Sequence, residues 1–206
     1  EIADRAERLG AEIGAGSSLD SSAVSLSALT DQLDPSLALF ADVVRRPAFP
    51  PKEIERVRKE WIAGIAREKQ SPESLAMRAL PPLLYGAGHP YAIPFSGTGT
   101  EAAIATLQRD DLLAFQRDWL RPDNATLIVT GDVTREQILP LLDKYFGDWA
   151  APASARPQKS LPTAASPSAP RVFLIARPGA PQTSLLAGGL MPSSLAENRF
   201  EIGTMN

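Results

Sequence analysis

The chain of 206 residues contains no cysteine and only one histidine, His89. The lack of cysteine excludes disulfide bonds, thiolate zinc sites and cysteine nucleophiles. No apolar run approaches the length of a membrane-spanning helix. Neither sign of charge dominates, because the net charge is −3 and charges of both signs are interspersed. This balance argues against a nucleic-acid-binding surface and against a basic patch for membranes.

A single histidine also limits the catalytic sites that the chain could build. A catalytic zinc needs three protein ligands, and neither H-E-x-x-H nor the inverted H-x-x-E-H occurs in the sequence. A Ser-His-Asp triad would have to use His89, which precedes Pro90 in a turn-rich loop. No partner motif accompanies His89, so we interpret it as a loop histidine that binds nearby backbone.

Glycines and carboxylates are plentiful, but neither group predicts a phosphate or acid–base site. The glycines of the loop are Gly86, Gly88, Gly97 and Gly99. No Gly-Lys-Ser/Thr sequence follows them and no strand closely precedes them, which disfavours a phosphate-binding loop. One predicted helix carries Glu53, Glu55, Glu60 and Glu68. Nothing in the sequence buries these carboxylates or makes them converge, so a solvated helix face is the better interpretation.

Apolar periodicity predicts an α+β fold in which a mixed β-sheet packs with helices. The first ten residues predict the end of a helix that stops at Gly10. Val24 and Leu26 alternate with serines, which predicts a half-buried strand after a loop or hairpin at residues 14–22. Residues 125–131 form a continuous apolar run and predict a further strand.

Helices occupy most of the sequence between these strands. Helix starts are indicated at Asp34 (N-cap), Pro51, Ser71, Thr98 (capping box with Glu101) and Thr134 (capping box with Gln137). A further helix is marked by Leu112, Phe115 and Trp119. The expected buried stripes of the first two helices are Leu37, Phe40, Ala41 and Val44, and Ile54, Val57, Trp61 and Ile65. We interpret Trp61 and Trp119 as core residues rather than as a ligand cage.

Composition changes after residue 150. Residues 151–170 hold five prolines and no apolar periodicity, which predicts an extended linker that moves relative to the core. Residues 171–179 and 183–190 then predict two apolar strands. We expect a lobe over residues 1–150 without its N-terminal part, the linker, and the start of a second, truncated lobe over residues 171–206. Exposed strand edges seek partners, so these two strands are expected to pair with the sheet of the first lobe or of another copy.

Both ends of the chain lack the usual signals. Glu1 is not preceded by an initiator methionine, and no signal-peptide pattern follows it. Residues 193–206 begin like a helix and reach no stop signal. We therefore interpret the chain as a segment of a longer protein and expect any targeting sequence to lie outside it.

Four stretches are more specific than a generic α+β domain. In order they are RAERLGAEIGAGSS (5–18), LDPSLALFADVVRRPAFPPKEIERVRKE (33–60), YGAGHPYAIPFSGT (85–98) and RPDNATLIVTGDV (121–133). Together they resemble the pitrilysin/insulinase family of zinc metallopeptidases, above all its bacterial members and the mitochondrial processing peptidases. The later stretch ARPGAPQTSLLAGG (176–189) is similar to the opening strands of the family's second lobe.

This resemblance implies where a zinc site would lie. Active members carry an H-x-x-E-H helix whose two histidines bind zinc and whose glutamate is the general base, and a distant glutamate completes the site. In this chain that helix would lie roughly a dozen residues before Glu1. The distant ligand position falls on Gly64, a second acidic position falls on Val57, and an asparagine of the family falls on Gly14. Glycine offers no side chain to a metal, so the resemblance implies a non-catalytic peptidase domain without catalytic, cofactor-binding or metal-binding residues.

The resemblance also implies a partner. Related peptidases consist of two homologous halves, on one chain or two, that close like a clamshell around a peptide. We expect this chain to belong to the half without zinc, with zinc in the other half, a peptide as substrate, and neither a nucleic acid nor a membrane span. An Arg/Tyr pair that such halves can supply to the substrate would lie beyond Asn206.

Two alternatives stay open. A relative with a purely structural or assembly role, as in the core subunits of respiratory complexes, would show the same departure at Gly64. An active member could instead use Glu60 or Glu68 as an unusual third ligand. Each lies one helical turn from Gly64, and this displacement of about 6 Å exceeds what metal geometry tolerates. The sequence does not specify the compartment, and analogy with bacterial relatives makes the periplasm the expectation.

Overall fold

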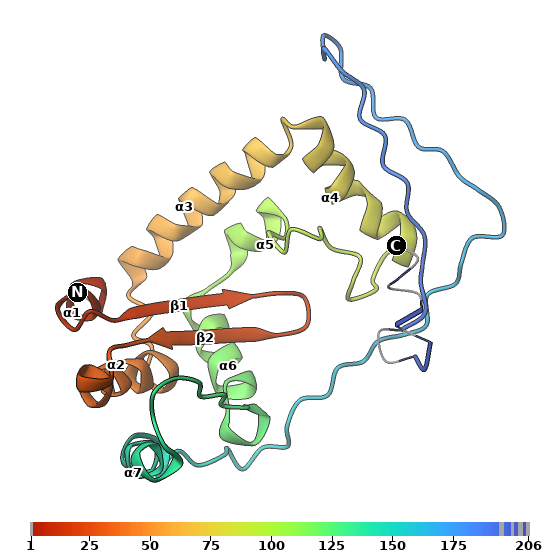
Figure 1. Cartoon of the computed structure of the whole chain (residues 1–206). Helices are drawn as coiled ribbons and strands as arrows, with labels where there is room; N and C mark the ends of the chain where they lie inside the picture. The colour runs from red at the N-terminus through yellow and green to blue at the C-terminus, as the bar shows by residue number, and fades with distance from the viewer. Residues whose placement is uncertain (1, 194–195, 199, 202–203, 205–206) are drawn as a thin grey trace. The chain divides into compact units, whose positions relative to one another are not determined.

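The computed structural model describes residues 2–193, 196–198, 200–201 and 204 and divides the chain into two compact units (Figure 1). The first unit comprises Glu1–Glu60 and Ala102–Lys159, and the second comprises Trp61–Glu101 and Ser160–Asn206. The boundary at residue 60 falls inside one helix, α3 (Pro51–Glu68).

A β-hairpin follows the first helix of the first unit. Helix α1 (Ile2–Arg8) ends before Gly10, whose φ of +61° is the left-handed stop that the sequence predicts. Strands β1 (Glu12–Ser17) and β2 (Ser22–Ser27) pair antiparallel, so that Ile13 faces Leu26. The predicted strand is confirmed, but the predicted loop is shorter than residues 14–22, because β1 continues to Ser17.

The core of the first unit is formed where α2 (Leu33–Arg45) packs with α7 (Arg135–Phe146) and with the hairpin (Figure 1). Leu37 and Phe40 of α2 form a buried cluster with Ile138 of α7. Val24 and Leu26 of β2 cover part of this cluster. The predicted stripe on α2 is therefore confirmed, and the hairpin buries its apolar face on that stripe.

The start of α2 differs from the prediction. A 3₁₀ turn, η1 (Thr30–Gln32), precedes the helix, and Gln32 occupies the N-cap position without a side-chain cap. Asp34 lies inside the first turn, where its carboxylate accepts hydrogen bonds from Lys144 Nζ at 2.9 Å and from Tyr145 Oη at 2.8 Å. The Asp34 side chain is thus used to join α2 to α7, which explains why it does not cap its own helix.

The capping boxes divide into one confirmed, one missed and one wrong. At α7, Thr134 Oγ1 accepts from Gln137 N at 3.3 Å and Gln137 Oε1 accepts from Thr134 N at 2.8 Å, as predicted. At α6 (Arg109–Trp119), Gln108 forms a box that the Ser/Thr pattern did not indicate. The box predicted at Thr98 is wrong, because helix α5 (Glu101–Thr106) begins three residues after Thr98. The Thr98 hydroxyl instead donates to Glu68 Oε2.

The second unit contains the later part of α3, helix α4 (Pro72–Tyr85) and a loop that ends at Glu101. Helix α4 begins and ends where the sequence predicts, because Ser71 Oγ accepts from Ser74 N at 3.4 Å and Gly86 follows its last residue. The predicted buried stripe of α3 is only partly correct. Ile65 is fully buried, whereas the side chains of Val57 and Trp61 are exposed.

Three predicted strands are absent from the described residues. Residues 125–131, 171–179 and 183–190 belong to no ladder, and the only sheet described is the two-stranded hairpin. A strand needs a neighbour for its backbone groups, and these segments are paired with none among the described residues. Residues 171–190 pair with no strand among the described residues, and Val172 and Leu185 are almost fully exposed; their expected pairing with another copy stays a prediction. The α+β class is confirmed, with an antiparallel hairpin in place of a mixed sheet.

The remaining segments carry little regular structure. Residues 151–170 contain no helix or strand and are mostly exposed. Half of the positions of the helix predicted at residues 193–206 lie outside the described residues. Among the helices that are described, none has both the length and the apolar character needed to cross a membrane.

Leu39, which is fully buried in α2, offers a test of the first unit's packing. We expect Leu39→Ala to lower the free energy of unfolding by about 2–5 kcal/mol, because it removes buried methyl groups and leaves a cavity. Leu139→Ala on α7 is the matched control, since Leu139 is half exposed and its helix propensity change is the same. Urea denaturation followed by circular dichroism measures both, and equal losses would contradict this packing.

The bonds of Asp34 predict a pH dependence. The hydrogen bond from Lys144, followed by that from Tyr145, lowers the pKa of Asp34 below its ordinary value of 3.8. A carboxyl whose pKa is lowered by folding contributes stability above its unfolded pKa, and that contribution is lost as the pH falls through the folded pKa. Asp34→Asn should therefore lower the urea midpoint at about pH 7 and change it little near pH 2.

The control for this experiment is Asp42→Asn. Asp42 makes an exposed ion pair with Arg46 one turn away on α2, and such pairs contribute little. An Asp34→Asn effect that is the same at both pH values would show that the carboxylate charge is not what joins the two helices.

Candidate functional site

Helix α3 carries the position at which the family resemblance puts a zinc ligand. Gly64 is half-buried, and a Cβ atom built there would meet only Arg67 Nη2, at 3.9 Å. The helix therefore has room for a side chain at this position and presents no donor atom. Val57, the second acidic position, is 43% exposed and is also unable to bind a metal.

The two carboxylates nearest in sequence to Gly64 are each paired with an arginine. Both oxygens of Glu60 accept from Arg56 Nη1 at 2.9 Å. Glu68 Oε2 accepts from Arg78 Nη1 at 2.5 Å. A guanidinium within hydrogen-bond distance opposes the binding of a cation to the same oxygens. The donor set around Gly64 therefore does not fit a catalytic zinc.

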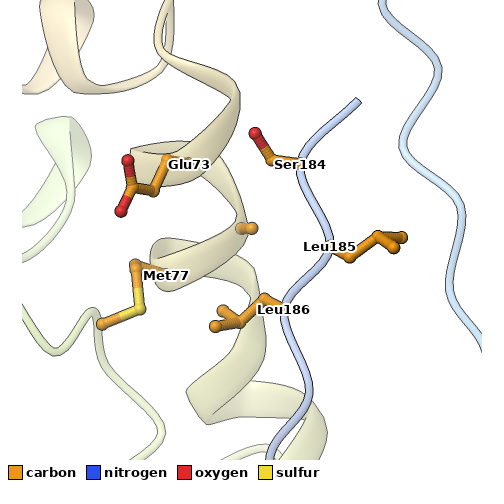
Figure 2. Close-up of a pocket in the computed structure, with 6 residues that line it drawn as sticks. Glu73, Met77, Ser184, Leu185 and Leu186 are labelled. Carbon is orange, nitrogen blue, oxygen red and sulfur yellow. The ribbon is translucent and has the colours of Figure 1, made fainter. Parts of the chain in front are cut away.

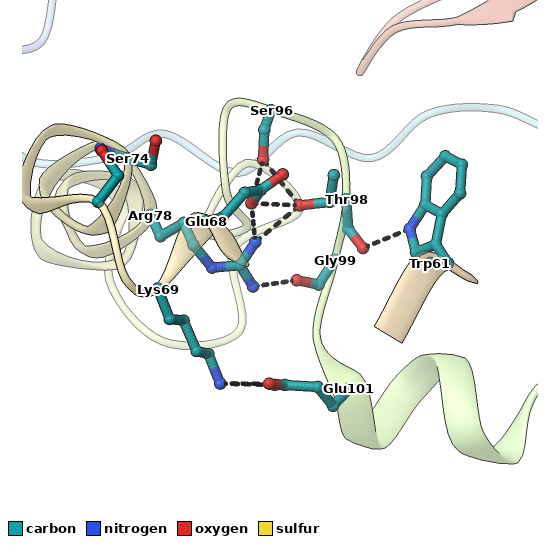
Figure 3. A network of polar contacts seen from close by, with 10 residues as sticks. Trp61, Glu68, Lys69, Ser74, Arg78, Ser96, Thr98, Gly99 and Glu101 are labelled. Atoms are coloured by element: carbon teal, nitrogen blue, oxygen red, sulfur yellow. Dashed lines mark hydrogen bonds and ion pairs between the residues drawn. The ribbon is translucent and has the colours of Figure 1, made fainter. Parts of the chain in front are cut away.

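Glu68 lies at the centre of a polar network in the second unit (Figure 3). Arg78 of α4, which is almost fully buried, also donates to Thr98 Oγ1 at 2.7 Å and to the Gly99 carbonyl at 2.5 Å. Thr98 Oγ1 donates in turn to Glu68 Oε2 at 2.9 Å. Buried charged groups that satisfy one another in this way fix the elements that carry them. The network holds the end of α3 and the middle of α4 against the loop.

Two further bonds attach α3 to the same loop. Trp61 Nε1 donates to the Thr98 carbonyl at 3.0 Å, so this indole is a surface anchor and not the core residue that we predicted (Figure 3). Lys69 Nζ donates to Glu101 Oε2 at 2.6 Å, and this hydrogen bond lowers the pKa of the Glu101 carboxyl. The indole and the ion pair bind opposite ends of the segment between Thr98 and Glu101.

His89 has the contacts of the loop histidine that we predicted. Its Nδ1 accepts from the backbone N–H of Tyr91 at 3.0 Å, and its Nε2 lies 2.9 Å from the Pro162 carbonyl. The assignment that satisfies both bonds places the proton on Nε2. The ring of Tyr85 stacks on the imidazole with 4.8 Å between centroids. Both ring nitrogens are occupied by backbone groups, which leaves neither for a metal or a nucleophile.

The second unit also contains a shallow hollow beside α4 (Figure 2). Its volume is about 270 Å³, and it is lined by Glu73, Ala76, Met77, Ser184, Leu185 and Leu186. Polar groups do not converge in it, since Glu73 supplies the only charged group of the lining. Within the part of the chain that the structure describes, no cluster of three or more His, Asp or Glu side chains could hold a metal.

Two family descriptions match the chain and together span nearly all of it. The insulinase family (peptidase family M16) matches residues 1–90, and the peptidase M16 inactive domain matches residues 106–206. Both descriptions belong to one class of proteins, the M16 peptidases. The chain belongs to the insulinase family of zinc metallopeptidases and carries its inactive domain.

Curated relatives agree with this assignment. The chain is 23% identical over 155 residues to the uncharacterized zinc protease YmxG of Bacillus subtilis, covering 75% of this chain and 37% of that protein. It is 26% identical over 144 residues to the probable mitochondrial-processing peptidase subunit beta of Schizosaccharomyces pombe, covering 68% of this chain and 30% of that protein. The chain thus spans less than two-fifths of either relative.

A solved structure gives the same result. The crystal structure of a peptidase M16 inactive domain from Pseudomonas fluorescens superposes with a TM-score of 0.71 at 30% sequence identity. The match covers 81% of this chain and 39% of that one. The family resemblance found in the sequence is therefore confirmed, and the matched models include the family's inactive domain.

The sequence did not indicate the network around Glu68. Glu68 looked like one carboxylate of a solvated face, and Arg78 lies ten residues away on a different helix. A turn-rich loop between them and Thr98 hides their proximity, because no periodic pattern connects a loop threonine to two helices. A basic residue in the middle of the otherwise apolar helix α4 is the one signal that was present.

A zinc titration tests the geometry around Gly64. We expect no tight zinc binding to this chain in isothermal titration calorimetry, because Gly64 offers no ligand and both adjacent glutamates bind arginines. Gly64→Glu should leave the result unchanged, although the helix has room for the side chain, since a lone carboxylate cannot replace a three-ligand site. Gly64→Ala is the steric control. One tight zinc site on the unaltered chain would contradict this geometry.

Proposed function

We propose that this chain belongs to the non-catalytic half of a zinc metalloendopeptidase, and that it forms part of the surface that encloses the peptide. The observation that carries the proposal is Gly64 on an intact α3. The helix has the length and the loop attachments of a formed element, but its metal-ligand position has no side chain.

The contacts of α3 support a role as a rigid part of the peptide-enclosing surface. A catalytic half can use its metal to connect separate elements, since metal binding contributes to folding. Here the charged pair of Glu68 and Arg78, extended to Thr98, connects α3, α4 and the loop without a metal. A surface of this kind can present backbone and side-chain groups to a peptide while it takes no part in the hydrolytic step.

The proposal assigns the chemistry to a partner. The hydrolytic step needs a metal-bound water and a carboxylate that accepts its proton, and this chain supplies neither. A half with an H-x-x-E-H motif, on the same polypeptide or a separate subunit, would hold the zinc. The curated relatives are named zinc proteases or processing peptidases, which supports a peptide as the substrate. The periplasm is the compartment that we propose for a bacterial protein of this type.

Reconstitution tests this function. The complete non-catalytic half is titrated into a zinc-loaded half that carries H-x-x-E-H, and hydrolysis of a fluorogenic peptide library is recorded. We expect activity to rise with added chain and to saturate at one-to-one stoichiometry, because the enclosing surface needs both halves. Changing the motif glutamate of the partner to glutamine should abolish the activity, which locates the chemistry there.

Two results would overturn the proposal. Stable binding without any change in peptide hydrolysis would indicate a structural or assembly role. Activity that survives loss of the partner's general base would place a catalytic group on this chain. The Gly64→Ala variant serves as the internal control and should support the same activity as the unaltered chain.

A further inference from the structure

Arg121 is the most deeply buried charged residue in the described part of the first unit, with 3% of its surface exposed. It lies between α6 and the short turn η2 (Pro122–Asn124). Its guanidinium forms a bidentate ion pair with Asp123, in which Nε lies 2.5 Å from Oδ1 and Nη2 lies 2.9 Å from Oδ2. This hydrogen bond to Arg121 lowers the pKa of the Asp123 carboxyl.

The other side of the guanidinium binds the backbone of the proline-rich segment. Arg121 Nη2 donates to the carbonyls of Pro152 and Ser154 at 3.2 and 3.0 Å, and Nη1 reaches that of Ala155 at 3.5 Å. Proline cannot donate from its own nitrogen, and extended segments of this kind make no internal hydrogen bonds. A buried arginine satisfies three such carbonyls at once, and Asp123 compensates its charge.

Two more contacts continue the attachment along the segment. Arg156 Nη1 donates to the Asp123 carbonyl at 3.3 Å. Lys159 Nζ donates to the Leu19 carbonyl at 3.2 Å and pairs with the carboxylate of Asp20 in the hairpin turn. All of these contacts lie within the first unit, which ends at Lys159.

We propose that Arg121 acts as a clasp that fastens residues 152–159 to the first unit, so that the part of the proline-rich segment that is not attached to this unit begins at Ser160. Composition alone predicts that all of residues 151–170 move. The buried arginine thus determines which residues of the proline-rich segment stay with the first unit.

Site-directed spin labelling tests the clasp. The 206-residue chain has no cysteine, so Ala153→Cys places a single nitroxide inside the fastened part and Ala165→Cys places one beyond it. Both alanines are exposed. We expect the label at position 153 to have a rotational correlation time several-fold longer than the label at position 165. Equal mobility at the two positions in the otherwise unaltered chain would overturn the proposal, and this comparison needs no change at Arg121.

Variants of Arg121 then test whether this residue is what immobilises position 153. Arg121→Gln should mobilise the label at position 153 and leave the label at position 165 unchanged. Arg121→Lys should restore little of the immobility of the label at position 153, because an ammonium cannot bind both carboxylate oxygens and three carbonyls together. Arg117→Gln is the matched control, since Arg117 makes an exposed pair with Asp118 on α6. A label at position 153 that stays immobile in Arg121→Gln, with the circular dichroism spectrum unchanged, would show that other contacts fasten the segment.

Discussion

The packing of one face of α2 is the interaction on which the first unit depends. Leu37 and Phe40 face Ile138 of α7, and the hairpin covers the same cluster from β2. Polar contacts then fix the direction in which the helices meet. Lys144 and Tyr145 of α7 bind Asp34 at the start of α2, and Arg45 at its end pairs with Asp148 at 2.8 Å and binds the Tyr145 carbonyl. Apolar burial brings the helices together, and charged groups at both ends of α2 define their register.

The second unit is held together in a different way. Its described apolar burial is slight, and Ile65 is the only large aliphatic side chain of α3 that is fully buried. Attachment of the loop relies on Arg78, which joins Glu68, Thr98 and the Gly99 carbonyl. Removing one partner of such a network leaves a charge without compensation, so each member depends on the others. The end of α3 is thus held to the loop mainly by hydrogen bonds and ion pairs, together with the buried side chain of Ile65.

The sequence indicated several helix boundaries correctly and was insufficient for the sheet. Local signals such as Ser71 before Pro72, Gly86 after Tyr85 and the Thr134–Gln137 box act within one turn, and the helices begin and end where they indicate. Apolar runs at residues 125–131 and 171–190 are compatible with strands, but a strand exists only beside a partner, and no local signal reports whether the partner is there.

In the candidate site, too, local sequence signals could be predicted and contacts made through loops could not. The prediction at Gly64 rests on the family pattern, which makes a missing side chain visible in the sequence, and it stays a prediction. The pairing of Glu68 with Arg78 and the binding of the proline-rich segment by Arg121 could not be predicted, because both connect residues through loops of irregular conformation. Asp34 shows the converse case, since its sequence position indicates a cap while the nearby side chains of Lys144 and Tyr145 bind its carboxylate.

The central claim is that this half encloses the peptide while the other half cuts it, and photo-crosslinking of a trapped peptide tests it most directly. A peptide with a photoreactive side chain would be bound to the assembled protein in which the general-base glutamate of the zinc half is replaced by glutamine. The account predicts crosslinks to both halves, identified by mass spectrometry, including residues of this chain. Crosslinks confined to the zinc half, with the two halves still assembled, would contradict it.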